Sequence, residues 1–214
     1  MRRDLELLDR VAEGRSAGAV RLYGFCPPCL SLGRLQSRDD VDWQACIRDG
    51  VDVVKRPTGG RAVLHDEEVT YSVTCRTDDA VFGGTVLESC RRIHGVLAAG
   101  LMMMGIETLL HVPAGDGRLT ATESAATADC FARLSAHELM DIRGRKLVGS
   151  AQARRARALL QHGSVPLHRP ATAEYLRGGA GPGRASSIRD LVRAPVHRDD
   201  VVVALAQAFS GHLG

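Results

Sequence analysis

The stretch Gly144-Arg-Lys-Leu-Val-Gly-Ser-Ala-Gln-Ala-Arg-Arg-Ala-Arg-Ala-Leu-Leu-Gln-His-Gly-Ser-Val-Pro-Leu167 decides the fold. Two runs rich in small and aliphatic residues, 145–153 and 157–167, flank an arginine-rich turn near Arg154–Ala156. Runs of this length on either side of a short polar break predict two antiparallel strands joined by a tight turn. This hairpin would set Gln161-His162-Gly163-Ser164 opposite Gly149-Ser150-Ala151-Gln152.

The rest of the chain adds strands and helices around this hairpin. Residues 68–75 alternate between apolar and polar side chains, which is typical of a strand with two different faces. Further strands are predicted at 19–24, 30–33, 51–54 and 136–142. Helices are predicted at 3–13, 40–48, 85–104, 172–177, 186–192 and 198–210, the third opening with the capping box Thr85–Glu88. We therefore predict an α+β fold with a largely antiparallel, mixed β-sheet flanked by helices.

Two further turns and one loop follow from composition. Residues 21–33 look like two strands joined by a tight turn, and Arg143-Gly144 looks like the turn of a hairpin between 136–142 and 145–153. Residues 113–128 are rich in Gly, Ala, Thr and Asp without any period, so they are predicted to form a mobile loop.

Bulk composition sets the class of protein. With 214 residues, 44% of them hydrophobic and 25% charged, the chain suits one domain, 1–214, with a full core. No apolar run approaches the roughly 20 residues of a membrane helix, and the charged N-terminus is unlike a signal peptide. We expect a cytoplasmic protein with no membrane contact. The net charge of +3 and the scattered arginines do not indicate nucleic-acid binding, whereas they suit an acidic protein partner.

Six cysteines raise the question of metal binding. In a cytoplasmic chain they should be reduced thiols. Cys26-Pro-Pro-Cys29 supplies only two ligands, and no second pair completes a four-ligand zinc site, so we expect a structural turn and no metal. Cys75 and Cys90 are predicted to be small core residues.

Lysine is scarce in this chain. Of 28 basic residues only Lys55 and Lys146 are lysine. An ammonium is a compact donor on a flexible stem and reaches polar sites that a planar guanidinium does not fit. We expect a functional role for Lys146, which lies beside the small residues 149–152, and a surface position for Lys55.

Three other sets of residues could contribute chemistry. Gly59-Gly60, between Arg56 and Arg61 and ahead of His65, could cradle a polar group through backbone N–H groups, although a plain turn fits as well. The small side chains of 149–152 leave room for a thin apolar chain, and His162 is either a base or a structural histidine. Cys130, at the end of the predicted loop, is either a nucleophilic thiol or an idle one.

Several of these stretches together resemble a known family. They are Arg21-Leu-Tyr-Gly-Phe with Leu30-Ser-Leu-Gly33, Arg56-Pro-Thr-Gly-Gly-Arg-Ala-Val-Leu-His-Asp66 with Thr70-Tyr-Ser72, Gly144–Gln152, and Leu160-Gln-His-Gly-Ser164. In this order they resemble the biotin/lipoate protein ligase superfamily, which includes lipoate–protein ligases and octanoyltransferases. Cys130, sixteen residues before Lys146, and Arg61, where ATP-using ligases show a third glycine, favour the octanoyltransferase branch.

The resemblance implies a reaction and a site. Cys130 would take octanoate from octanoyl-acyl-carrier protein and pass it to a lysine of a lipoyl domain of 2-oxoacid dehydrogenases or of the glycine-cleavage H protein. Lys146 would polarise the acyl carbonyl, and no metal or ATP would be needed. The residues expected to bind substrate are Arg56, Thr58, Gly59, Gly60, Arg61, His65, Gly149, Ser150, Ala151, Gln152, His162 and Gly163.

The chain also departs from the family pattern. The family has a strand before the first helix, whereas this chain begins inside the Met1-Arg-Arg-Asp4-Leu-Glu-Leu7-Leu8 motif, so that strand is expected to be missing. No C-terminal accessory domain is expected after the last helix. Two alternatives stay open: an ATP- and Mg-dependent lipoate–protein ligase, and a non-catalytic remnant that binds an acyl group or a partner.

Overall fold

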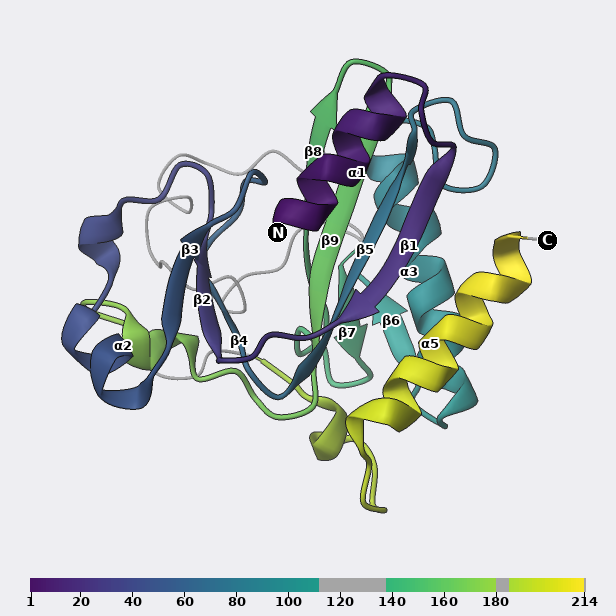
Figure 1. Cartoon of the computed structure of the whole chain (residues 1–214). Coiled ribbons are helices and arrows are strands. Elements are labelled where there is room, and N and C mark those ends of the chain that lie inside the picture. The colour runs from purple at the N-terminus through teal and green to yellow at the C-terminus, as the bar shows by residue number, and fades with distance from the viewer. Residues whose placement is uncertain (112–137, 180–184, 214) are drawn as a thin grey trace.

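The computed structural model describes residues 1–111, 138–179 and 185–213, which form two β-sheets, a short β-ribbon and covering helices (Figure 1). The strands are β1 (Gly18–Tyr23), β2 (Cys29–Leu32), β3 (Asp52–Lys55), β4 (Val63–His65), β5 (Glu68–Arg76), β6 (Thr108–Leu110), β7 (Leu139–Asp141), β8 (Gly149–Arg155) and β9 (Ala158–Pro166). The α-helices are α1 (Arg2–Ala12), α2 (Trp43–Asp49), α3 (Val86–Met103) and α5 (Arg198–Leu213). Short 3-10 helices are η1 (Arg38–Asp40), η3 (Thr172–Tyr175) and η4 (Ile188–Asp190). No helix in the described ranges has the length and apolar character needed to cross a membrane.

The large sheet confirms the hairpin predicted from residues 144–167. Its four antiparallel strands follow the order β1-β5-β9-β8. Strands β8 and β9 are joined by a two-residue turn at Ala156-Arg157, and Ser150 faces Gly163 across the ladder. Ala156 has a φ of 49°, the left-handed conformation that such turns require. In the described residues β8 is an edge strand of this sheet.

Both faces of the large sheet are covered, which the alternation of β5 did not reveal. Val69, Tyr71 and Val73 join the apolar core beneath α3 and α5, as their spacing predicts. Thr70 and Ser72 point to the opposite face, yet they are only 2% and 1% exposed. Helix α1 lies across that face (Figure 1), and the small sheet abuts it through contacts described below. The polar stripe of β5 is therefore buried and must find hydrogen-bond partners.

The small sheet corrects the tight turn predicted for residues 21–33. Strand β2 does not pair with β1; it pairs in parallel with β3 and antiparallel with β4. The segment between β1 and β2, which includes the cis Cys26-Pro27 bond, crosses from one sheet to the other. Strand β4 was not predicted, because its three residues are too few to show a period.

Local helix predictions hold with small shifts. The capping box of Thr85 and Glu88 opens α3, as predicted. Helix α2 is capped by Asp42 rather than Asp40, since the Asp42 side chain accepts from the Ala45 N–H. Val86 was expected on the apolar stripe of α3, but it is 51% exposed and lines a space beside β8 instead of the core.

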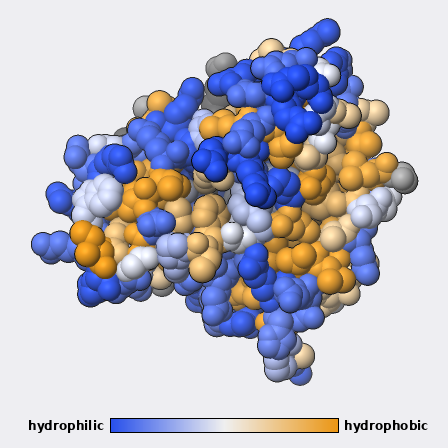
Figure 2. All heavy atoms as spheres, viewed as in Figure 1, coloured by the Kyte–Doolittle hydropathy of each residue, from blue (hydrophilic) through white to orange (hydrophobic). Residues whose placement is uncertain are grey.

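The hairpin predicted around Arg143-Gly144 is only partly formed. Strand β7 pairs with β6, which the sequence did not predict, and it meets the following segment through a single bridge between Met140 and Lys146. The loop predicted at 113–128 lies outside the described residues. On the side shown in Figure 2, charged residues cover the outer side of α1 and apolar residues gather beside β1 and α5.

Candidate functional site

A narrow cavity lies where the two sheets meet. Its free volume of about 20 Å3 is room for one water molecule. The large sheet contributes Thr70, His162, Gly163, Ser164 and the start of β8, and the small sheet contributes Ser31, Val63 and His65, with Arg56 and Met1 completing the wall. Most of the expected substrate-binding residues are therefore brought together around one space, which we call the junction cavity.

Arg56 holds the Gly59–Arg61 loop against the small sheet. Its guanidinium is 4% exposed and donates to the carbonyl oxygens of Ser31 (2.8 Å), Gly59 (2.8 Å) and Arg61 (2.6 Å). Gly60 has a φ of +83°, and its carbonyl oxygen lies only 1.8 Å from where a Cβ on Gly33 would be. Arg56 thus acts as a structural clamp on the loop that the sequence predicted would cradle a ligand.

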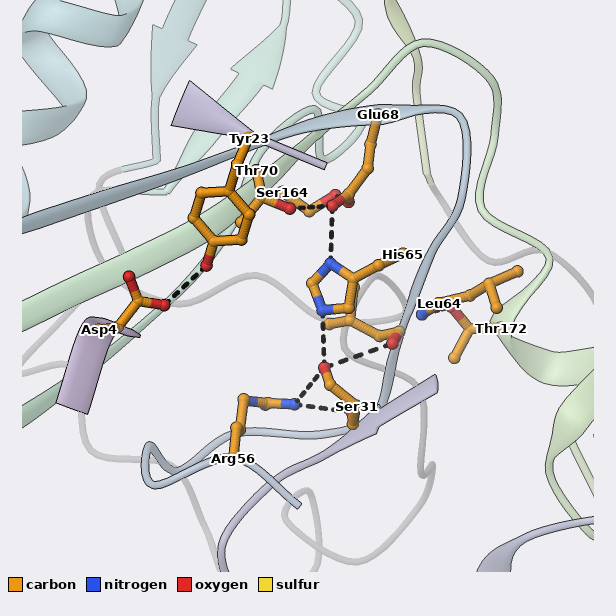
Figure 3. Close-up of polar contacts among 11 residues, drawn as sticks. Asp4, Tyr23, Ser31, Arg56, Leu64, His65, Glu68, Thr70, Ser164 and Thr172 are labelled. Atoms are coloured by element: carbon orange, nitrogen blue, oxygen red, sulfur yellow. Dashed lines mark hydrogen bonds and ion pairs between the residues drawn. The ribbon is translucent and has the colours of Figure 1, made fainter. Parts of the chain in front are cut away.

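His65 connects the two sheets through a chain of hydrogen bonds (Figure 3). Its Nε2 lies 2.8 Å from Ser31 Oγ, and its Nδ1 lies 2.7 Å from Glu68 Oε1. Glu68 also accepts hydrogen bonds from the hydroxyls of Thr70 and Ser164. Sequence reasoning selected His65 but missed Ser31 and Glu68, although a glutamate at the start of a buried strand was a signal that could have found one of them.

His162 points into the same region from β9. Its Nε2 lies 2.7 Å from Thr58 Oγ1, so Thr58 and His162 join the loop to the large sheet. Burial, reinforced by the positive charge of Arg56, lowers the pKa of His162 to about 3. The imidazole is therefore neutral near pH 7 and a weak base, which favours a structural role over general-base catalysis.

Asp4 anchors α1 above the sheet, a role that the sequence did not reveal. Its carboxylate is fully buried and accepts from Tyr23 (2.7 Å), Ser72 (2.8 Å) and Arg21. Burial would raise the pKa of Asp4, but the hydrogen bonds from Tyr23 and Ser72, together with the positive charges of the N-terminus and Arg21, hold it below its ordinary value. Asp4 therefore stays ionised and fixes the helix that borders the junction cavity.

A second, wider space lies on the other face of β8, between this strand and the start of α3. Its volume is about 190 Å3, and we call it the β8 groove. Gln152 lines this groove together with Ser150 and Ala151, and it is not among the residues that line the junction cavity. Successive side chains of a strand point to opposite faces, which places Ala151 and Gln152 on different sides.

The floor of the β8 groove is a buried polar cluster. Ser150 Oγ lies 2.6 Å from Tyr71 Oη and 2.8 Å from His94 Nε2. His94 Nδ1 in turn lies 3.7 Å from Cys90 Sγ. Cys90 is half-buried and lines the groove rather than filling the core, and burial raises the pKa of its thiol to about 12. This thiol is protonated near pH 7, so it lacks the thiolate that nucleophilic chemistry needs.

Lys146 is buried, so it is not simply a lysine on the surface. Its side chain is 2% exposed, and its Nζ donates to Glu138 Oε1 over 2.7 Å. Glu138 lines the β8 groove, so the ion pair borders this groove rather than the junction cavity. Cys130, the expected nucleophile, lies outside the described residues.

The described cysteines show no metal-binding geometry. Cys26 is exposed whereas Cys29 is buried in β2, and all the described cysteines are free. Over residues 1–111, 138–179 and 185–213, no three His, Cys, Asp or Glu side chains are grouped as a metal would need.

Comparison with known proteins assigns the family. A family model described as "Lipoyl protein ligase A/B catalytic domain" matches residues 1–210. The octanoyltransferase LipM of Kyrpidia tusciae is 41% identical over 95% of this chain and 78% of its own length. The octanoyltransferase LipM of Geobacillus kaustophilus is 40% identical over 77% of this chain, but the match spans only 59% of that relative.

A solved structure shows the same fold. The crystal structure of lipoate-protein ligase A bound with ATP superposes with a TM-score of 0.73 at 20% identity, covering 98% of this chain and 79% of the ligase chain. This likeness confirms the mixed α+β architecture that the sequence predicts. Because the family model matches residues 1–210 of the 214 in this chain, the chain belongs to the lipoyl protein ligase A/B catalytic domain family.

Proposed function

We propose that this protein is an octanoyltransferase that moves octanoate from octanoyl-acyl-carrier protein to a lysine of a lipoyl domain or of the glycine-cleavage H protein. The observation that supports it most strongly is the 41% identity to an octanoyltransferase over 95% of this chain. In this proposal the acyl carrier protein and the lipoyl-domain or H-protein acceptor are cytoplasmic, as is the enzyme. The donor thioester is already activated, so the reaction needs neither ATP nor a metal.

The proposed reaction has two acyl transfers. First, the Cys130 thiolate attacks the carbonyl carbon of the octanoyl thioester, and the thiol of the carrier leaves. Next, the amine of the acceptor lysine attacks the octanoyl-Cys130 thioester, an amide forms, and the Cys130 thiol leaves. Each step passes through a tetrahedral oxyanion, which must be stabilised by positive charge or by hydrogen-bond donors.

Lys146 is our candidate for stabilising this oxyanion. An ammonium has three N–H donors, and the contact with Glu138 holds the group in place. We propose that one of these donors turns to the acyl carbonyl oxygen when the thioester binds. The burial of Lys146 strengthens such a contact, because electrostatic interactions are stronger where water is excluded.

The junction cavity is our candidate for the acyl pocket. Gly149, Ala151 and Gly163 leave little side-chain bulk on its β8–β9 wall. Its present volume of about 20 Å3 is smaller than an eight-carbon chain, so the walls must move apart when the chain enters. The His65 and Arg56 networks would then set the floor and one side of the pocket.

The experiment is an intact-mass measurement after incubation with octanoyl-acyl-carrier protein. We expect the parent protein to gain one octanoyl group in place of a hydrogen, and Cys130→Ala and Cys130→Ser to gain none. Cys26→Ala, which changes an exposed cysteine in the segment between β1 and β2, is the matched control and should be modified like the parent.

Other outcomes would point elsewhere. Near-normal octanoyl transfer by Cys130→Ala would contradict the covalent mechanism. ATP-dependent modification of a lipoyl domain by free lipoate would support a lipoate–protein ligase instead. A protein that showed neither reaction would be a binding remnant.

A further inference from the structure

The β8 groove and the junction cavity meet at the edge of the large sheet. Both are lined by Ser150 and Ala151, one from each face of β8. β8 has a neighbour on one side only in the described sheet, so the two spaces flank the same edge strand. The two spaces together could hold the two halves of one extended ligand.

Gln152, which lines the groove, holds a buried hydrogen-bond acceptor that has no partner among the described residues. Its Nε2 donates to the Val86 carbonyl oxygen (3.2 Å) and to Gln161 Oε1 (2.6 Å). A carbonyl oxygen only accepts, so the Val86 contact requires Nε2 of Gln152 on that side; Gln161 then turns Oε1 to Gln152 and Nε2 to Tyr71 Oη. Gln152 Oε1 is then buried without a hydrogen-bond partner among the described residues. An unmet buried acceptor is destabilising, and an N–H group of a ligand would satisfy it.

The walls of the groove are mainly apolar. Val86 and Leu87 at the start of α3 are 51% and 54% exposed, and Ala151 and Cys90 continue the wall inward. A pure hydrocarbon would match these walls but would leave Gln152 Oε1 unmet. A thin aliphatic chain that carries amide N–H groups satisfies both requirements.

We infer that the β8 groove holds the pantetheine arm through which the acyl carrier protein presents its thioester. This inference rests on the proposed octanoyltransferase function. The arm is an aliphatic chain with two amides that ends in the thiol. With the acyl chain in the junction cavity, the thioester lies at Ser150–Ala151, beside the Lys146–Glu138 pair. The arm leaves past Leu87, and one of its amide N–H groups donates to Gln152 Oε1.

The first test compares donors with and without amides. In single-turnover formation of octanoyl-Cys130, followed by intact mass, we expect Gln152→Met to lower kcat/KM roughly three- to tenfold with octanoyl-pantetheine, the effect of one lost hydrogen bond. With the octanoyl thioester of ethanethiol, which has no amide, the loss in the same variant should be clearly smaller. Gln44→Met, the same change at an exposed position of α2, is the matched control for both donors.

Two results would overturn the inference. One is an equal loss by Gln152→Met with both donors. The other is a shift in preference among hexanoyl, octanoyl and decanoyl donors in Gln152→Met or Leu87→Ala, because it would place the acyl chain in the groove. If the parent protein forms no acyl-enzyme from any donor, the proposed function itself fails, which is a different outcome.

A second test needs no catalysis. In a Cys26→Ser/Cys130→Ala protein, Cys90 is the remaining cysteine that is not buried, and it lines the groove. We expect a thiol-free pantetheine analogue, pantothenic acid N-ethylamide, to slow alkylation of Cys90, and to do so less in the same protein with Gln152→Met. A Cys90 alkylation rate that does not change at saturating analogue would place the arm elsewhere.

Discussion

Lys146 Nζ donates to Glu138 Oε1 over 2.7 Å, and the two side chains are 2% and 5% exposed. Removing one partner of a buried ion pair is destabilising, because the other partner then remains a buried charge whose lost hydration is no longer offset by an opposite charge. The pair therefore holds the ammonium in place next to the start of β8.

The first prediction concerns the ammonium. Lys146→Arg should lower the rate of octanoyl transfer by roughly 10²–10³, because the planar fork cannot deliver the same donor to the oxyanion. The same change should lower the free energy of unfolding by about 1–3 kcal/mol, because the larger side chain overpacks a buried site. A lysine on the surface would show no such loss. Lys55→Arg, an exposed control, should change neither property. Transfer by Lys146→Arg at the parental rate would disprove the role.

The ion pair itself can be tested by stability alone. Lys146→Met removes the ammonium from the buried Glu138 carboxylate, so we expect the free energy of unfolding in urea denaturation to fall by about 3–5 kcal/mol. Adding Glu138→Gln to Lys146→Met should restore much of the lost stability, because the buried negative charge is removed. Simple additivity of the two single changes would show that the side chains are not coupled.

The acid sensitivity of the fold should depend on His162. Its pKa in the folded state is about 3, against an ordinary value of 6.5 in the unfolded chain. Between these values the unfolded state binds more protons, so the free energy of unfolding falls as the pH falls below 6.5, by at most about 1.4 kcal/mol per pH unit. Denaturation at pH 7 and pH 5 should show a smaller decrease for His162→Gln than for the parent. Equal decreases would contradict the lowered pKa.

Replacing glycine by alanine should have opposite effects on stability at Gly163, in the closely packed hairpin, and at Gly95, in an open position of α3. A Cβ on Gly163 would lie 2.4 Å from the Gly149 carbonyl oxygen and 2.6 Å from the Tyr71 ring, so Gly163→Ala should destabilise the fold by about 1–3 kcal/mol or more. Gly95 lies in α3, and a Cβ there meets nothing within 4 Å. Gly95→Ala should therefore stabilise it by about 1 kcal/mol. Equal melting temperatures of the two variants would refute this reading.

The cysteines of the crossing segment should be dispensable for turnover. The double variant Cys26→Asn/Cys29→Thr should keep its transfer rate. It should also lose about 1–3 kcal/mol of stability, because Cys29 is buried and threonine brings a hydroxyl there. Cys26→Ser/Cys29→Ala avoids that hydroxyl and should lose less. Stoichiometric zinc in the parent protein, absent from the double variant, would overturn the structural assignment.

The sequence by itself determined the elements whose cause is local. The β8–β9 hairpin follows from two apolar runs around a short turn, and the start of α3 follows from the Thr85–Glu88 capping box. The motif residues Arg56, His65 and His162 were also recognisable, because their neighbours in the chain show the resemblance to the family. The hairpin and the helix start depend on interactions between residues close in the chain, and the motif residues were recognised from their neighbours in the sequence.

Only the tertiary structure decided which of these residues meet and what they do. Thr58 contacts His162 across 104 positions of the chain, and Ser164 contacts Glu68 across 96. Periodicity places a side chain on one face of its own strand, but it does not say what covers that face. Gln152 turned out to line the β8 groove but not the junction cavity, and Arg56 turned out to clamp its loop. Burial and long-range packing, rather than local pattern, fixed these roles.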